Sequence, residues 1–245
     1  MLASLSRLDF PARTLTVRVR IADRRVLSLA AFSVAILTPV FFLSARALHG
    51  EHDVTVAFAH AAALVGAVLL GYEAFFAAQR TTWLRQPVVV RAPLDASIPF
   101  LPAWVWVYGA LYYVIIAFPA GLLTDARTFA WFIAGGLAML AVALPIYVVW
   151  PTETPAEWRS YEGGGVSRRF LRFIQSFDNG RGCVPSLHMA FSVYAATFYP
   201  WPLSVVLIPV VVGLACVLVK QHSILDLLPG WLLGLLAGVV IHARI

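Results

Sequence analysis

Long apolar stretches recur along this chain, and they restrict its fold more than any other feature. A helix needs about 20 mostly apolar residues to cross the hydrocarbon core of a bilayer. Seven stretches come near that length, although the fifth and sixth are short: residues 26–48, 54–78, 99–123, 128–150, 185–199, 202–219 and 225–242. The pattern therefore predicts a bundle of membrane-spanning helices.

The composition supports lipid as the solvent of this chain. Hydrophobic residues make up 61% of the sequence and charged residues only 12%, whereas a soluble domain is about 25% charged. A water-soluble core cannot hide so much apolar surface. We therefore predict an all-α fold, a polytopic integral membrane helix bundle of six or seven spans that forms a single domain over residues 1–245.

The charge distribution indicates a membrane partner. The formal net charge is +6, but the arginines form no long run beside aromatic residues, which argues against nucleic acid. Anionic lipid headgroups are the simpler partner for a basic membrane protein. Residues 1–25 carry six arginines, and we interpret them as a basic arm on the cytosolic or interfacial side of the first span.

The longest polar connection, residues 151–184, contains a second membrane signal. It holds three consecutive glycines at residues 163–165, which are typical of a flexible joint. The segment SRRFLRFIQSF that follows, residues 167–177, alternates basic and apolar residues at helical spacing. This pattern predicts a short amphipathic helix lying on the membrane surface.

Several isolated polar residues have simple structural interpretations. His60 and Glu73 lie inside the second span, where a hydrogen bond between helices is the expected reason for a polar group. The loop sequence HGEHD at residues 49–53 has ligand types that suit zinc, but adjacent loop charges are usually just solvated. We expect no metal site, and two unpaired thiols at Cys183 and Cys216.

The sequence GRGCVPSLHMAFS has the features of an anion site at a helix start. Pro185 fits the first turn of a helix, where its missing N–H has no cost. Ser186 and the free backbone N–H groups beyond it then form a cradle for an anion such as phosphate. His188 lies at the edge of that cradle, and the guanidinium of Arg181 can bind two phosphate oxygens.

The sequence KQHSILD suggests an activated histidine. If this segment is helical, His222 and Asp226 are four residues apart and share a face. A carboxylate that holds one ring nitrogen's proton makes the other nitrogen a better nucleophile or base. Because His188 starts the fifth span and His222 ends the sixth, both histidines should lie at one membrane face. Lys220, the only lysine of the sequence, lies beside them.

These two motifs resemble the signatures of the phosphatidic acid phosphatase type 2 superfamily of membrane lipid phosphatases and phosphotransferases. Its second signature, P-S-x-H, matches residues 185–188, and the H-x-x-x-D of its third matches His222 and Asp226. The resemblance implies that His222 is a nucleophile forming a phosphohistidine, that Asp226 orients it, and that His188 protonates the leaving group. It also implies that Ser186 helps to bind phosphate and that no cofactor is required.

The resemblance is incomplete at the phosphate clamp. The first signature, K-x6-R-P, is absent, and the arginine expected six residues before the nucleophile is replaced by Cys216. The leading substitutes are Lys220 and Arg181, and Arg159 is a weaker one. Alternatively, Lys220 does not bind phosphate and merely extends its ammonium to the membrane interface.

One branch of the superfamily, the inositol phosphorylceramide synthase-like phosphotransferases, is more similar. Its members tend to have P-S-L-H and K-Q-H-x-x-x-D, an I-P-F-x-P stretch as at residues 98–102, and a P-T segment as at residues 151–152. This similarity implies that Lys220 is a phosphate ligand. It favours transfer of a phospho-headgroup from a lipid phosphate to a lipid or polyol acceptor.

Other functions remain open at this point. A lipid or polyprenyl (pyro)phosphate phosphatase uses the same first half-reaction. A proton-coupled membrane transporter and a metal-dependent membrane hydrolase are alternatives of other classes. Family resemblance implies a bacterial inner membrane with an extracytoplasmic active site, whereas the arginine-rich loops favour the cytosolic side.

Overall fold

The computed structural model describes residues 24–49, 54–81 and 84–245. The basic arm predicted at residues 1–25 and the loop cluster at residues 49–53 lie almost entirely outside these residues. Those two predictions therefore stay untested. All other predicted segments can be compared with the structure.

The predicted helix bundle is confirmed. Within the described residues, five helical segments are long and apolar enough to cross a membrane. They are α1 (Arg24–His49), α2 (Val54–Arg80), the segment Pro102–Leu122, α4 (Ala126–Val149) and α8 (Ile224–His242). Two shorter apolar helices, α6 (Leu187–Ala196) and α7 (Ser204–Leu218), correspond to the fifth and sixth stretches.

The third span departs from a uniform α-helix. It begins with the 3₁₀ turn η2 (Pro102–Trp104), continues as the π-helix η3 (Trp106–Leu111) and ends as α3 (Tyr112–Leu122). A π-turn widens the helix locally and is frequent at functional sites. Apolar periodicity alone does not reveal such a change of helix type.

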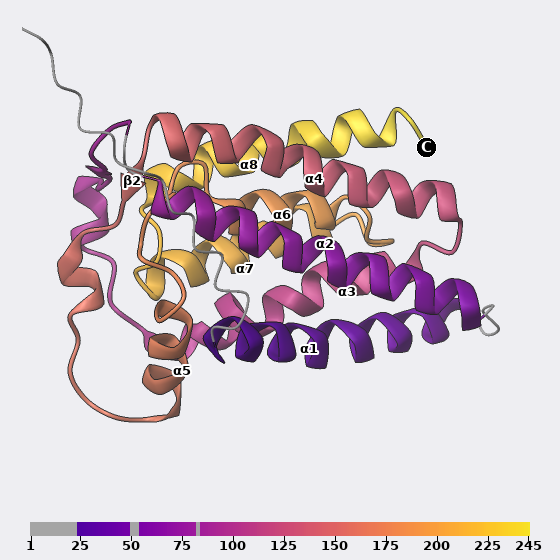
Figure 1. The fold of residues 1–245 in the computed structure, drawn as a ribbon, viewed down its shortest axis with the longest axis horizontal. Helices are drawn as coiled ribbons and strands as arrows, with labels where there is room; N and C mark the ends of the chain where they lie inside the picture. Colours follow the sequence, from indigo (N-terminus) through magenta and orange to yellow (C-terminus); the bar gives the residue numbers. More distant parts are fainter. Residues whose placement is uncertain (1–23, 50–53, 82–83) are drawn as a thin grey trace, which may run out of the picture.

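Successive helices run in alternate directions, so every second connection lies at the same end of the bundle (Figure 1). The short elements gather at one end, on the left in Figure 1, while the C-terminus lies at the other. These elements are β1 (Val88–Val89), η1 (Pro93–Ala96), β2 (Thr152–Glu153), η4 (Ala156–Arg159) and α5 (Val166–Gln175). β1 and β2 pair in parallel, with Val88 opposite Thr152.

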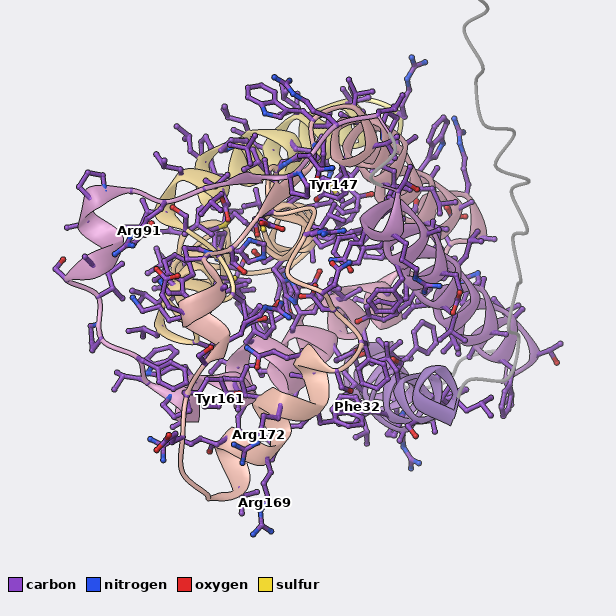
Figure 2. The ribbon with its side chains drawn as sticks, turned by 60° about the vertical axis from the view of Figure 1, so that its left-hand side comes forward. Phe32, Arg91, Tyr147, Tyr161, Arg169 and Arg172 are labelled. Atoms are coloured by element: carbon purple, nitrogen blue, oxygen red, sulfur yellow. The ribbon has the colours of Figure 1, made fainter. Side chains whose placement is uncertain are left out.

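The predicted amphipathic helix is confirmed as α5. Leu171 is fully buried on its inner face, and Phe170 stacks on Trp106 of the third span with ring centroids 4.6 Å apart. On the outer face, Arg169 points away from the protein and Arg172 lies near Tyr161 (Figure 2). Basic groups on one face and aromatic groups on the other suit a helix at a membrane surface.

The two polar residues of α2 have different surroundings. His60 is buried and stacks on Phe129 of α4, with ring centroids 4.0 Å apart. Glu73 is exposed on the surface of α2, so the expected hydrogen bond between helices stays a prediction for this residue. Its position about two turns from the end of α2 leaves the carboxylate within reach of the interface.

A row of glycines lets α8 approach α6 closely. Gly230, Gly234 and Gly238 recur at every fourth residue, and an added Cβ at the first two would lie 2.3 Å and 2.2 Å from backbone oxygens of α6 and its cap. Small residues at this spacing allow helix backbones to meet inside a membrane. The close approach also brings the start of α6 against the start of α8, where the Ser186 amide donates to the Asp226 carbonyl at 3.1 Å.

We predict that Gly234→Ala destabilises the bundle, because the new methyl group would lie 2.2 Å from the Ala190 carbonyl oxygen. Overpacking of this kind costs about 1–3 kcal/mol. Thermal unfolding in detergent should show a lower melting temperature. Gly66→Ala in α2 is the control, because nothing lies within 4 Å of its added Cβ. Equal melting temperatures for the two variants would contradict the close-packing argument.

Candidate active site

The loop that leads into P-S-L-H is held by Thr152 on β2. The Thr152 hydroxyl accepts hydrogen bonds from the amides of Cys183 and Val184 at 3.0 Å and 3.1 Å, and its carbonyl accepts from Gly182 at 2.8 Å. The hydroxyl of Tyr147 donates to the Pro185 carbonyl at 2.5 Å. The chain is therefore fixed immediately before α6, and the P-T segment noted in the sequence provides much of that support.

The start of α6 differs from the expectation in one detail. Pro185 precedes the helix, following a cis peptide bond, and does not occupy its first turn. Ser186 is the N-cap, and its fully buried hydroxyl accepts from the Met189 amide at 3.3 Å. The serine thus satisfies the helix start itself, and His188 follows as the second helical residue.

The connection between α7 and α8 is a turn and not the continuous helix that the i, i+4 argument assumed. The Gln221 amide bonds the Cys216 carbonyl, and the Lys220 amide bonds the Val217 carbonyl, which is the Schellman pattern of a helix end. Lys220 has a φ of +56° and occupies the left-handed position where glycine is usual. His222 therefore lies outside both helices.

The expected contact between His222 and Asp226 forms despite the turn. Ser223 caps α8, and Asp226 in its first turn accepts from the Ser223 amide at 3.0 Å. The same carboxylate oxygen, Oδ2, lies 3.2 Å from Nδ1 of His222. Asp226 is fully buried, so the contact is shielded from water. A proton held on Nδ1 leaves the Nε2 lone pair of His222 free to react.

The two histidines meet in the structure. The ring centroids of His188 and His222 lie 5.9 Å apart, although His188 is in α6 and His222 is in the turn between α7 and α8. His188 is held between two tyrosines of the third span, Tyr108 at 4.1 Å and Tyr112 at 4.5 Å between ring centroids. Tyr108 lies in the π-helix and Tyr112 follows directly after it, so this turn presents both rings to His188.

A cleft with an empty volume of about 800 Å³ contains both imidazoles. His188, His222 and Arg181 line it, among the residues proposed from the sequence. Asp226 and Ser186 lie behind its wall. The other lining side chains are mainly aromatic: Phe32, Tyr72, Phe75, Phe76, Tyr108, Tyr112, Tyr113, Phe173 and Phe177.

The two loop arginines are held differently. Arg159 bonds the Asp178 carbonyl at 2.6 Å and its carboxylate at 3.2 Å, and approaches Gln221 at 3.5 Å. It therefore neutralises Asp178 from behind the cleft. Arg181 lines the cleft, and its guanidinium has one long contact of 3.4 Å with Glu153. Arg181 is the arginine better placed to bind an incoming anion.

The structure does not bring Lys220 into the cleft. Its ammonium donates to the Asp95 carbonyl at 2.7 Å and lies 5.3 Å from the centre of the Trp158 ring. The left-handed turn directs the side chain toward η1 and away from the histidines. Burial lowers the pKa of Lys220, and the neighbouring Asp95 carboxylate opposes that shift.

Cys183 is the other potentially nucleophilic group at the cleft. It is buried, and its thiol donates to the Gly180 carbonyl at 3.3 Å. Burial raises the pKa of the Cys183 thiol well above its usual range, with further increases from Asp226 and Asp178. The reactive thiolate is therefore scarce at neutral pH, which leaves His222 as the better nucleophile.

A second, apolar cavity adjoins the cleft. It lies between α2, α3, α4 and α6, and it shares His188 and Leu187 with the cleft wall. Its lining is almost wholly hydrocarbon: Leu64, Val68, Ile116, Phe132, Leu137, Leu140 and Phe191 among others. A hydrophobic chain could lie here with its polar end at His188.

Sequence reasoning missed several residues near the site. Tyr108 and Tyr112 carry no signal for a site, because nothing in the sequence marks a π-turn. Asp95 and Asp178 lie in polar connections outside any motif, yet Asp95 is only 1% exposed. Within the described part of the chain, no group of three or more His, Cys, Asp or Glu side chains is arranged to hold a metal ion.

Comparison with known proteins gives one match. The family described as the PAP2 superfamily matches residues 73–240, a range that includes both histidine motifs. No curated protein and no solved structure matches the chain.

We predict that Arg181→Gln raises the KM for a phosphate-bearing substrate by about 10- to 100-fold, because a hydrogen bond to a charged group contributes about 1.5–3 kcal/mol. The value of kcat should change much less. Arg91→Gln is the matched control, since Arg91 also pairs with a glutamate, Glu157, but on the exposed surface. Steady-state kinetics of both variants test this. An unchanged KM for Arg181→Gln would exclude it as the clamp.

Proposed function

The chain belongs to the PAP2 superfamily, and from this premise we propose that it is a membrane lipid phosphotransferase that works through a phosphohistidine. The observation that carries the proposal is the paired histidine geometry. Nδ1 of His222 lies 3.2 Å from the buried carboxylate of Asp226. The imidazole of His188 lies across the same cleft, with the two ring centroids 5.9 Å apart. Two histidines with different neighbours can divide nucleophilic and acid–base work.

In the first half-reaction, Nε2 of His222 attacks the phosphorus of the lipid phosphate ester. The N–P bond forms as the P–O bond to the leaving group breaks. Protonated His188 gives its proton to the departing oxygen. Asp226 holds the Nδ1 proton and stabilises the positive charge that develops on the ring. Arg181 binds the phosphoryl oxygens and holds the phosphate in the cleft.

In the second half-reaction, His188 is neutral and accepts a proton from the acceptor. The acceptor oxygen then attacks phosphorus, the N–P bond breaks and His222 returns to its starting state. Water as acceptor gives a phosphatase, and an alcohol gives a transferase. The aromatic lining of the cleft disfavours bulk water, which supports transfer to an alcohol on a lipid or polyol.

The apolar cavity supports a lipid as the phosphate donor. It meets the cleft at His188, so one molecule can place its chain in the cavity and its phosphate between the imidazoles. A soluble phosphate ester has no hydrophobic chain to place in this cavity. The proposal therefore predicts that long-chain lipid phosphates are better substrates than their water-soluble headgroup analogues.

We also propose that the cleft faces outside the cytosol in a bacterial inner membrane, as the family resemblance implies. The basic residues at this end would place it in the cytosol by the positive-inside rule. Several of them have local partners that explain their presence, since Arg91, Arg159 and Arg181 each pair with a carboxylate.

The enzyme proposal predicts a covalent intermediate on His222. Purified protein incubated with ³²P-labelled phosphatidic acid and quenched in base should carry acid-labile label. His222→Ala should carry none and lose turnover. His188→Ala should lose most turnover, because it lacks both the proton donor and the later base. Adding alcohol acceptors and identifying the labelled products then separates transferase from phosphatase.

His242→Ala is the control for loss of an imidazole. His242 lies at the opposite end of α8, where its Nε2 is 3.1 Å from the Thr197 carbonyl, and its removal should leave labelling unchanged. Full activity of His222→Ala would overturn the proposed function. Loss of activity on chelation, with restoration by a divalent metal, would favour a metal-dependent hydrolase instead.

The orientation proposal predicts where the C-terminus lies. The helix α8 runs from the cleft end of the bundle to the C-terminus at the other end (Figure 1). An extracytoplasmic cleft therefore requires a cytosolic C-terminus. A C-terminal green fluorescent protein fusion should fluoresce, and a C-terminal alkaline phosphatase fusion should be inactive. The reverse result would place the cleft in the cytosol.

A further inference from the structure

Asp95 is an unusual residue for a polar loop. It lies in the 3₁₀ turn η1 and is only 1% exposed. Its carboxylate accepts from its own loop at the Ala92 amide, 2.7 Å away. It also accepts from the Ser223 hydroxyl at 2.6 Å and from the Ile224 amide at 3.1 Å. A buried carboxylate is kept only where such donors replace water.

Asp95 contacts the segment that carries His222 on both sides. Before His222, the Lys220 ammonium donates to the Asp95 carbonyl at 2.7 Å. After His222, Ser223 donates its hydroxyl proton to the Asp95 carboxylate. One residue, more than 120 positions earlier in the chain, therefore fixes both ends of the turn from Lys220 to Ser223.

The same contacts extend to the partner of His222. The Ser223 amide donates to Oδ2 of Asp226 at 3.0 Å, and this oxygen is the one that lies 3.2 Å from the His222 ring. A shift of Ser223 would move the donor that holds the Asp226 carboxylate in place. Asp95 itself does not line the cleft, so it can influence the reaction only through these residues.

The backbone of Lys220 indicates that this arrangement is maintained at a cost. A residue with a side chain in the left-handed region costs about 1–2 kcal/mol relative to glycine. Lys220 nevertheless adopts a φ of +56° at the position where a helix end most often has glycine. The contact of its ammonium with Asp95 gives a reason for a lysine there that is unrelated to phosphate binding.

We propose that Asp95 is a positioning residue that, with Lys220, fixes the imidazole of His222 in the geometry for attack on phosphorus. This inference rests on the proposed function, in which His222 is the nucleophile. Catalysis by positioning is sensitive to small displacements, because a misplacement of about 1 Å can lower the rate about 100-fold. The interactions affect the rate of the chemical step and leave phosphate binding to other groups.

The test compares kcat and KM for detergent-purified variants with phosphatidic acid in mixed micelles. Asp95→Asn places an amide N–H₂ among three donors, so at least one contact is lost. We expect kcat to fall about 10- to 100-fold, while KM changes by less than about twofold. The rate of phosphohistidine formation should fall in parallel with kcat.

Lys220→Gly separates positioning from stability. Glycine removes the strain of the left-handed turn but also removes the ammonium, so the melting temperature should change little. We expect kcat to fall with KM unchanged. A raised KM with normal kcat would overturn the proposal for Lys220 and identify it as a phosphate ligand, as the family resemblance implied.

Asp125→Asn is the matched control. Asp125 caps α4 by accepting from the Thr128 amide at 2.7 Å, at the end of the bundle opposite the cleft. Both aspartate variants weaken a helix start, but Asp125→Asn should leave kcat per folded molecule unchanged. If Asp95→Asn does not fold, Ser223→Ala removes the link from Asp95 to the turn, together with the cap contact to the Leu225 amide, and should lower kcat in the same way.

The outcomes separate this inference from the proposed function. Inactive His222→Ala with normal kcat in Asp95→Asn and Ser223→Ala would overturn the positioning role alone. Active His222→Ala would overturn the proposed function, and the positioning role with it. Equal losses of kcat in Asp95→Asn and Asp125→Asn would contradict the positioning role and show that the Asp95 contacts contribute only to folding.

Discussion

The site depends on one carboxylate held without water at the start of a helix. Asp226 is fully buried, and burial of a lone carboxylate is costly unless hydrogen bonds and charges compensate. Its Oδ2 has the Ser223 amide and the His222 ring as neighbours, while its Oδ1 has no hydrogen-bond partner among the residues that the structure describes. The partial positive charge at the start of α8 also lies beside this carboxylate. In the proposed mechanism, the positive charge that develops on His222 stabilises the carboxylate further, so the chemical step relieves a cost that folding imposes.

Packing between α6 and α8 fixes the position of Asp226 relative to the start of α6. The glycine row of α8 lets the two backbones touch, and the Ser186 amide bonds the Asp226 carbonyl directly. Because His188 is two residues after Ser186, the same contact that fixes the helix pair also fixes the separation of the two imidazoles. The fold and the catalytic geometry therefore share their supports, and a change in helix packing should alter both.

Much of this arrangement could be predicted from the sequence, and the exceptions have physical reasons. Apolar length predicted all seven helical stretches, and the alternation of basic and apolar residues predicted the amphipathic helix α5. Two short motifs predicted which histidines would meet, because a chain that crosses and returns must bring His188 and His222 to one end. The position of Lys220 could not be predicted, since a left-handed backbone at a lysine leaves no mark in the sequence. Its partner Asp95 lies 125 residues away in a loop that reads as solvated, and only the folded chain brings the two together.

The charges around the cleft explain how a site for an anion can include acidic groups. Asp178 lines the cleft, but it is neutralised by Arg159 and accepts from Gln79 and from the Gly180 amide at 2.8 Å and 2.7 Å. Asp95 is enclosed by its own donors behind the wall. Among the described basic side chains at the cleft, Arg181 has the weakest hold, a single 3.4 Å contact with Glu153. A phosphate that enters must compete only with Glu153 for this guanidinium. Because the Arg181–Glu153 pair is partly exposed, replacing Glu153 by phosphate costs less free energy than breaking a buried ion pair. In the proposed mechanism, Arg181 at the mouth of the cleft therefore binds the phosphate, while the two histidines inside the cleft carry out the chemical step.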